Sequence, residues 1–161
     1  MGSADRAPFF VVIERHGCAA VKKRLLLDRH DLVSGWVAAK TGYLPGGKYW
    51  AVGLIESDGF TQRLVAGCVF DNWRGHDITG HIACDAPVTR PFLHAIHDLP
   101  YRVLGVRRIT ATVRADNAAS MEFLRRIGFK HEGTIRAGYT DGSDRLIFGQ
   151  LKENAKWLVS R

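Results

Sequence analysis

The segment 108–133 constrains the fold more than any other part of the chain. It begins with apolar and polar side chains that alternate over residues 108–113, which is the period of a half-buried strand. After a short polar turn, Asn117 suits the residue that caps the start of a helix, and Gly128 suits the residue that ends it. Phe129 then returns the chain to the core. The segment predicts a strand, a helix and a second strand that pack as one unit.

Length and composition predict a single domain that spans residues 1–161. With 161 residues and 46% hydrophobic content, the chain can bury one core. The net charge of +7 predicts an anionic partner, which is a phosphate-bearing cofactor, a nucleic acid or an acidic protein surface. Cys18, Cys68 and Cys84 lie within apolar runs and form no metal-ligand pair, so we interpret them as reduced core residues.

The N-terminal half predicts a strand, two helices and an antiparallel meander. The apolar, β-branched run 9–13 favours a buried strand. Apolar and basic residues recur at helical spacing over 18–27 and 31–40, with Asp31 as N-cap and Gly42 as the stop of the second helix. Three strand-like segments separated by turns follow, at 51–56, 63–70 and 77–83.

The C-terminal half predicts a crossover helix and a closing hairpin. Residues 91–99 place apolar side chains on one helical face, and Pro100 ends or kinks this helix. A right-handed crossover through it brings the strand 108–113 parallel to the strand 77–83. Asp141-Gly142 is a turn between strands at 133–139 and 145–151. The expected class is α+β, with a mixed, mostly antiparallel central sheet flanked by helices.

These residues resemble the GNAT acetyltransferase superfamily, in particular its branch of ribosomal-protein N-terminal acetyltransferases. The resemblance lies in the pattern Asn-x-x-Ser, Gly-Phe-x-x-Glu-Gly-x-x-Arg and Asp, here Asn117, Ser120, Gly128, Phe129, Glu132, Gly133, Arg136 and Asp144. The chain is also similar to uncharacterised phage and prophage GNAT-like proteins near Pro100-Tyr101 and Lys156-Trp157. The resemblance implies a GNAT fold and acetyl-CoA (coenzyme A) as the cofactor.

The resemblance also implies where the cofactor binds. Its pantetheine arm would pair with the backbone of the strand before the crossover helix, in the manner of an added strand. Its pyrophosphate would meet the start of that helix, although the segment 85–92 lacks the family's glycines. The implied cofactor-binding residues are Ile82, Ala83, Cys84, Thr89, Arg90, Asn117, Ser120, Phe123 and Arg126.

Acyl transfer to an amine needs a base for the amine and an acid for the departing thiolate. Many members of the family supply a tyrosine as the acid, but this chain has Leu124 at that position, which leaves Ser120 as the candidate. Candidate bases are Glu56, Asp71, His81 and Asp85; of these His81 has a suitable ordinary pKa, about 6.5. We therefore take Ser120, His81 and Asp85 as candidate catalytic residues. A metal site at His94 and His97 is disfavoured because no tight ligand set accompanies them.

The function expected from the resemblance is an acetyl-CoA-dependent N-acetyltransferase. The acceptor would be an unidentified amine, either a protein α-amine or a small molecule. Two alternatives stay open: a catalytically inactive GNAT-fold protein that binds nucleic acid or a protein partner, and a phage-type enzyme that modifies nucleobases. No apolar run is long enough to cross a membrane and no secretory signal is present, so we expect a cytoplasmic monomer or homodimer.

Overall fold

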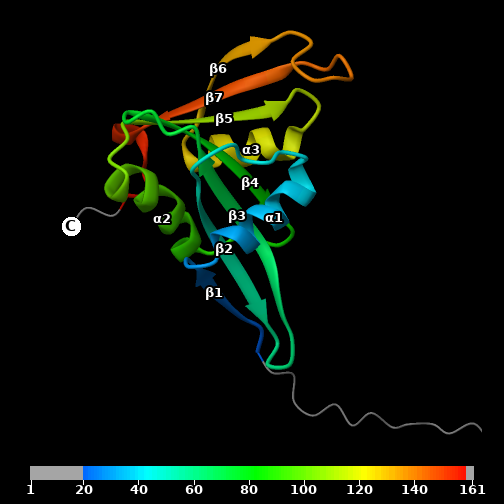
Figure 1. Ribbon diagram of the computed structural model, residues 1–161, viewed down its shortest axis with the longest axis vertical. Coiled ribbons are helices and arrows are strands. Elements are labelled where there is room, and N and C mark those ends of the chain that lie inside the picture. Colours follow the sequence, from blue (N-terminus) through cyan, green and yellow to red (C-terminus); the bar gives the residue numbers. More distant parts are fainter. Residues whose placement is uncertain (1–19, 159–161) are drawn as a thin grey trace, which may run out of the picture.

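The computed structural model describes residues 20–158, which form one seven-stranded sheet with three α-helices (Figure 1). The elements follow the chain as β1 (Lys22–Leu26), α1 (His30–Thr41), β2 (Trp50–Ser57), β3 (Gln62–Asp71), β4 (Asp77–Cys84), α2 (Arg90–Asp98), a π-helical turn (Leu99–Val103), β5 (Arg108–Arg114), α3 (Ala118–Ile127), β6 (Lys130–Ile135), β7 (Arg145–Leu151) and a short 3₁₀ helix (Lys152–Asn154). None of the helices described is long and apolar enough to cross a membrane.

The strands are arranged in the order β1-β2-β3-β4-β5-β7-β6. Every neighbouring pair is antiparallel except β4 and β5, which are parallel and are joined by the crossover through α2. The expected α+β class, the mixed and mostly antiparallel sheet and the parallel return of β5 are therefore confirmed.

The parallel pair is short, and this shapes the rest of the molecule. β4 and β5 pair at only three positions: Asp77 with Arg108, Ile78 with Ile109, and Thr79 with Thr110. Beyond Thr79, β4 stays paired with β3 and β5 stays paired with β7. The two central strands therefore diverge toward their carboxyl ends.

Helices cover both faces of the sheet. Val52 and Leu54 of β2 pack in one core with residues of α2 and α3, whereas Ala51 and Ile55 pack in a second core with α1. Because successive residues of a strand point to opposite faces, α1 lies on the face opposite α2 and α3. Gly67 of β3 allows α1 to approach, since a Cβ there would stand 2.8 Å from Val37 Cγ2.

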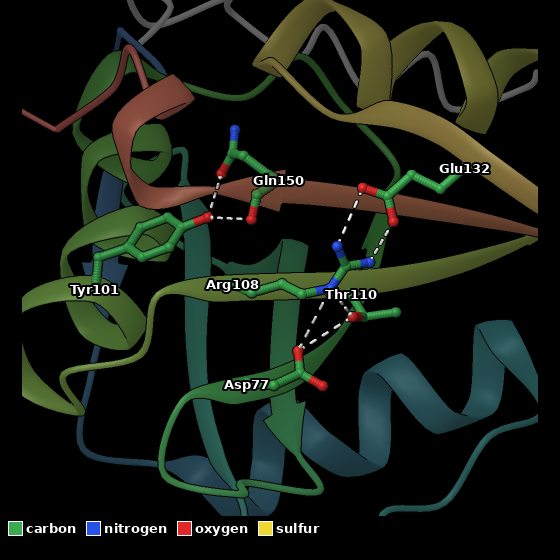
Figure 2. Close-up of polar contacts among 6 residues, drawn as sticks. All are labelled: Asp77, Tyr101, Arg108, Thr110, Glu132 and Gln150. Atoms are coloured by element: carbon green, nitrogen blue, oxygen red, sulfur yellow. Dashed lines mark hydrogen bonds and ion pairs between the residues drawn. The ribbon is translucent and has the colours of Figure 1, made fainter.

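Polar contacts tie β4, β5 and β6 together at the paired end of β4 and β5 (Figure 2). Thr110 Oγ1 donates to Asp77 Oδ1 at 3.1 Å, and Arg108 reaches from β5 to form two hydrogen bonds with Glu132 of β6. The Arg108–Glu132 pair passes over Gly149 of β7, where a Cβ would collide with both side chains. These contacts hold the sheet together on the side where β4 and β5 do not separate.

The sequence predictions of helices, strands and caps were wrong at three places, and Cys84, expected in the core, is exposed. The expected helix at 18–27 is instead the strand β1 where it is described, because these residues pair with β2 and bury Leu26 beneath α1. The strand expected at 133–139 is β6, which starts at Lys130 and contains a bulge before Gly133. Asp31 lies in the first turn of α1 rather than at its cap. The expected strand at 9–13 lies outside the described residues.

The remaining helix signals have the predicted effect. Gly42 and Gly128 end α1 and α3 in the left-handed conformation, with φ of 71° and 105°. Asn117 caps α3, and its side chain accepts a hydrogen bond from the backbone of Ser120. Pro100 lies in the π-helical turn that continues from α2, so this proline changes the helix without ending it at once.

Candidate functional site

A cleft of about 560 Å³ opens where β4 and β5 diverge. Its walls come from residues 79–84 of β4 and 111–114 of β5. The start of α3, the end of α1, the loop after it and the residues around the hairpin of β6 and β7 complete the lining. The cleft requires the short β4–β5 pairing, because continued pairing of these strands would fill it with backbone hydrogen bonds.

The cleft has two chemically different sides. Gly80, Ile82 and Ala111 belong to the strand positions that face α2 and α3, so this side is apolar. Thr79, His81 and Thr112 belong to the positions that face α1, so this side is polar. A ligand that passes between the strands can therefore contact apolar side chains on one face of the sheet and polar side chains on the other.

His81 is the best-organised polar group in the cleft. Its Nε2 lies 3.0 Å from Oδ1 of Asp71, whose side chain is completely buried at the end of β3. The Tyr43 ring stacks on the His81 ring at 3.8 Å, and the Tyr43 hydroxyl donates to the other oxygen of Asp71. The carboxylate accepts the Nε2 proton, which leaves Nδ1 as the nitrogen with a free lone pair.

Burial sets the proton affinities of this group. It lowers the pKa of His81 below its ordinary value, although the hydrogen bond to Asp71 opposes that shift. Burial, together with the hydrogen bond to Asp71, raises the pKa of Tyr43 to about 12. At neutral pH, His81 is therefore a neutral imidazole and Tyr43 is a neutral donor.

The backbone of β4 presents polar groups to the cleft. The N–H of Asp85 donates to the carbonyl of Val65 at 2.7 Å, which fixes the phase of the β3–β4 ladder. Since hydrogen-bonded pairs alternate along an antiparallel ladder, Ala83 directs its backbone groups toward β3, and Ile82 and Cys84 direct theirs toward the cleft. Ile82 and Cys84, two of the three residues predicted to contact pantetheine, therefore present backbone groups to the cleft, and the contacts themselves stay predictions.

The start of α3 brings further predicted residues to the cleft. Asn117 and Ser120 both line it, and the Asn117 side-chain oxygen already accepts the Ser120 N–H at 3.0 Å. Leu124 is 3% exposed and lines the same wall. Among the predicted catalytic residues, the fold therefore brings His81 and Ser120 to one cleft.

Other predicted residues lie away from the cleft lining. Thr89 caps α2, where its hydroxyl accepts the Phe92 N–H at 3.4 Å, and Arg90 is exposed in the first turn of that helix. Asp85 forms an ion pair of 2.6 Å with Lys40 of α1. Phe123 packs against the core, and Arg126 is exposed on α3. The functional roles of these residues stay predictions.

The histidines set aside as metal ligands have backbone partners. His94 Nδ1 lies 2.5 Å from the carbonyl of Trp157, and His97 Nδ1 lies 2.7 Å from that of Leu93. His97 is buried, and its Nε2 has no hydrogen-bond partner in the described part of the chain. Burial lowers the pKa of His97, so the neutral form is the stable one.

Among known proteins, the chain is similar in fold to solved structures. No family model matches the chain, and no curated protein matches it. A ribosomal-protein alanine acetyltransferase from Vibrio fischeri superposes with a TM-score of 0.59 at 13% identity, over 84% of this chain and 95% of that one. The spermidine/spermine N-acetyltransferase of Vibrio cholerae gives 0.57 at 12% identity, over 83% and 93%.

A putative acetyltransferase from Acinetobacter baylyi superposes with a TM-score of 0.60 at 18% identity, over 83% of this chain and 95% of that one. The chain has the fold of the GNAT acetyltransferases. The GNAT fold expected from the sequence is thereby confirmed. The resemblance to phage proteins stays a prediction.

The sequence named Asp71 among the candidate bases and Tyr139 among aromatic residues that could line a pocket, but it did not indicate where either lies, and it gave no role to Arg145. The place of Asp71 beneath His81 depends on the β3–β4 register, in which Asp71 faces Thr79 and Val69 faces His81. Tyr139 and Arg145 line the cleft from the hairpin of β6 and β7. The pairing of Arg145 with Arg114 of β5 places them there, and this cross-strand match has no signature in local sequence.

Proposed function

We propose that the protein is an acetyl-CoA-dependent N-acetyltransferase that uses the cleft between β4 and β5. The divergence of these strands after Thr79 is the observation that carries the proposal. It leaves the backbone of Ile82 and Cys84 free to bind an amide-bearing arm as an extra strand would. The fold shared with acetyltransferases supports the same reading.

The cofactor supplies an acetyl thioester, and the residues of the chain position it and move protons. Asn117 has used its oxygen to cap α3, so its amide group remains available to a ligand in the cleft. The basic side chain of Arg90, together with the start of α2, is suited to phosphate. The segment 85–92 lacks the family's glycines, so phosphate binding at the start of α2 is the part of the proposal that a direct binding measurement tests first.

His81 is the proposed general base. Its free Nδ1 accepts a proton from the acceptor amine, and Asp71 holds the ring in the required tautomer and stabilises the imidazolium. The amine nitrogen then bonds to the thioester carbon, the carbon–sulfur bond breaks, and the sulfur takes a proton. Ser120 is the proposed donor of that proton, because it lines the apolar side of the cleft near Leu124.

The first test is calorimetric titration with acetyl-CoA and with desulfo-CoA, followed by mass spectrometry of amines incubated with acetyl-CoA. We expect saturable binding of both ligands and transfer of one acetyl group to an amine. Asn117→Ala in a folded protein should weaken binding of both ligands. Absence of binding at millimolar ligand would refute the enzyme, and salt-dependent binding of DNA or RNA in its place would support the inactive binding protein.

A further inference from the structure

The fully charged side chains in the described lining of the cleft are all cationic. Among the described residues that line it, the side chains that carry a full charge at neutral pH are Lys40, Arg114 and Arg145, and none is an aspartate or glutamate. The side chain of Asp71 lies beneath His81 and is 0% exposed. The described lining therefore offers no carboxylate of its own to a cationic acceptor.

Two of the three cations already have carboxylate partners. Lys40 pairs with Asp85, and Arg114 pairs with Asp116 and with Asp141. Arg145 differs, because no carboxylate within residues 20–158 lies at ion-pair distance from it. Among the described residues, it is the lining cation that has no carboxylate partner.

Arg145 is nevertheless held in place. One of its terminal nitrogens donates to the carbonyl of Gly138 at 2.6 Å, and its guanidinium lies 4.7 Å from the centre of the Tyr139 ring. Its Nε is buried and has no hydrogen-bond partner in the described structure. A guanidinium held in this way is preorganised for a carboxylate or phosphate, which its terminal N–H groups can bind through charge-assisted hydrogen bonds.

Arg145 also lies on the same side of the sheet as His81. It pairs with Arg114 of β5, and Arg114 is two residues beyond Thr112, which shares the α1 side of the sheet with His81. His81 lies on β4 and Arg145 on β7, with β5 between them, and neighbouring paired strands lie about 5 Å apart. An acceptor that contacts both side chains must therefore carry the two groups several bonds apart.

We propose that Arg145 binds an oxyanion of the acceptor, so that the protein acetylates amines that carry a carboxylate or phosphate several bonds from the nitrogen. The inference rests on the proposed acetyltransferase activity and specifies its acceptor. Polycationic acceptors, which the name of the Vibrio cholerae enzyme indicates for that protein, would meet Arg145 but no carboxylate in the described lining, so we expect them to be disfavoured.

The test compares four C-terminally amidated dipeptides that differ only in the second residue: alanyl-glutamate, alanyl-glutamine, alanyl-lysine and alanyl-phosphoserine. Each is titrated calorimetrically into the protein saturated with coenzyme A, and each is assayed with acetyl-CoA. We expect the glutamate peptide to bind about tenfold or more tightly than the glutamine peptide, and the lysine peptide to bind most weakly. The phosphoserine peptide distinguishes a phosphate from a carboxylate. If it binds more tightly than the glutamate peptide, the site is assigned to phosphate.

Variants identify the residue responsible. Arg145→Gln should bring the affinity for the glutamate peptide down to that for the glutamine peptide and leave the affinity for coenzyme A unchanged. Arg145→Lys keeps the charge but loses the planar fork, so it should recover part of the preference. Arg107→Gln, which removes an exposed arginine just before β5, is the matched control and should have no effect.

Equal binding of the glutamate, glutamine and lysine peptides, or tightest binding of the lysine peptide, would overturn the inference. So would an Arg145→Gln variant that keeps the acidic preference and instead loses affinity for coenzyme A. These results differ from a failure of the proposed function, in which acetyl-CoA neither binds nor transfers its acetyl group. Peptide affinities decide the role of Arg145 even if turnover is too slow to measure.

Discussion

At the scale of single residues, the Asp71 and His81 pair is the group on which the chemistry depends. A histidine in a strand is ordinary, and only its partners make it a candidate base. Here one ring nitrogen is fixed by a fully buried carboxylate and one ring face is covered by Tyr43. The arrangement leaves a single nitrogen, Nδ1, to accept a proton.

The pH dependence of the reaction follows from the lowered pKa of His81. The imidazole must be neutral to act as a base, so its protonation should make kcat/KM fall as the pH drops through this pKa. Because burial lowers the pKa, the fall should begin below about 6.5, the ordinary value for histidine. Asp71→Asn reverses the hydrogen bond, places the proton on Nδ1, and should lower kcat about 100-fold or more.

Steady-state rates between pH 5 and 9, measured at saturating acetyl-CoA, test this prediction. Asp31→Asn removes an exposed carboxylate in the first turn of α1 and is the matched control. Thermal unfolding verifies that each variant is folded. Wild-type rates in Asp71→Asn would show that another group is the base.

Residue roles were predictable only where the local sequence carries them. Asn117 and Gly128 could be assigned as helix caps because capping depends on the residue and its nearest neighbours. The partners of His81 could not, since Asp71 is ten residues away and Tyr43 comes from a loop far earlier in the chain. Side chains that meet through strand register and loop position leave no local pattern.

At the scale of elements, the exposed edge of β4 makes a prediction for amide hydrogen exchange. Without ligand, the N–H groups of Ile82 and Cys84 face the cleft, whereas that of Ala83 faces β3. A pantetheine arm that binds as an added strand should protect the first two amides and leave Ala83 protected in both states.

Exchange followed by NMR, with and without saturating acetyl-CoA, measures all three amides in one sample. The amide of Ala83 is the internal control, because general stabilisation of the fold would slow its exchange as well. Uniform slowing across 82–84 would indicate stabilisation without added-strand binding, and unchanged exchange at Ile82 and Cys84 would place the cofactor elsewhere.

The strands and helices with strong periodicity could be predicted from the sequence. The misassigned ones depend on pairing with other strands, which periodicity does not reveal. The segments that form β2 and β3 are apolar over most of their length, the segment that forms β4 is apolar over half of it, and all three are bounded by turn residues. β1 contains only five residues, two of them lysines, and its partner β2 rather than its own pattern makes it a strand. The limits of β6 depend on a bulge opposite β7, which single-strand patterns do not reveal.

At the scale of the whole molecule, the sheet must separate in the middle and still fold as one unit. β1 to β4 and β5 to β7 share only three pairs of residues in register, so other contacts must join the two halves. The larger core supplies most of this connection, because α2 and α3 pack against strands of both halves. The Arg108–Glu132 and Asp77–Thr110 contacts add to it at the paired end (Figure 2).

Tyr101 and Gln150 make the buried part of this connection, and their removal tests it. The Tyr101 hydroxyl donates to both the backbone and the side-chain oxygen of Gln150, at 2.9 and 3.0 Å, and Gln150 donates in turn to the carbonyl of Ile127 at 2.8 Å. Tyr101→Phe keeps the ring and leaves the buried Gln150 oxygen without this donor. The expected loss in the free energy of unfolding is about 1–3 kcal/mol.

Urea unfolding at neutral pH measures this loss. Tyr49→Phe is the matched control, because the Tyr49 hydroxyl has no hydrogen-bond partner among residues 20–158. Removal of that hydroxyl should change the free energy of unfolding by less than about 0.5 kcal/mol. Tyr101 is not part of the cleft lining, so the affinity of Tyr101→Phe for acetyl-CoA should match that of the wild type. A single cooperative transition with a lower midpoint would show that the two halves unfold together in spite of the cleft. Separate transitions of the halves would contradict the idea that the cores joined through α2 and α3 hold an open sheet as one folding unit.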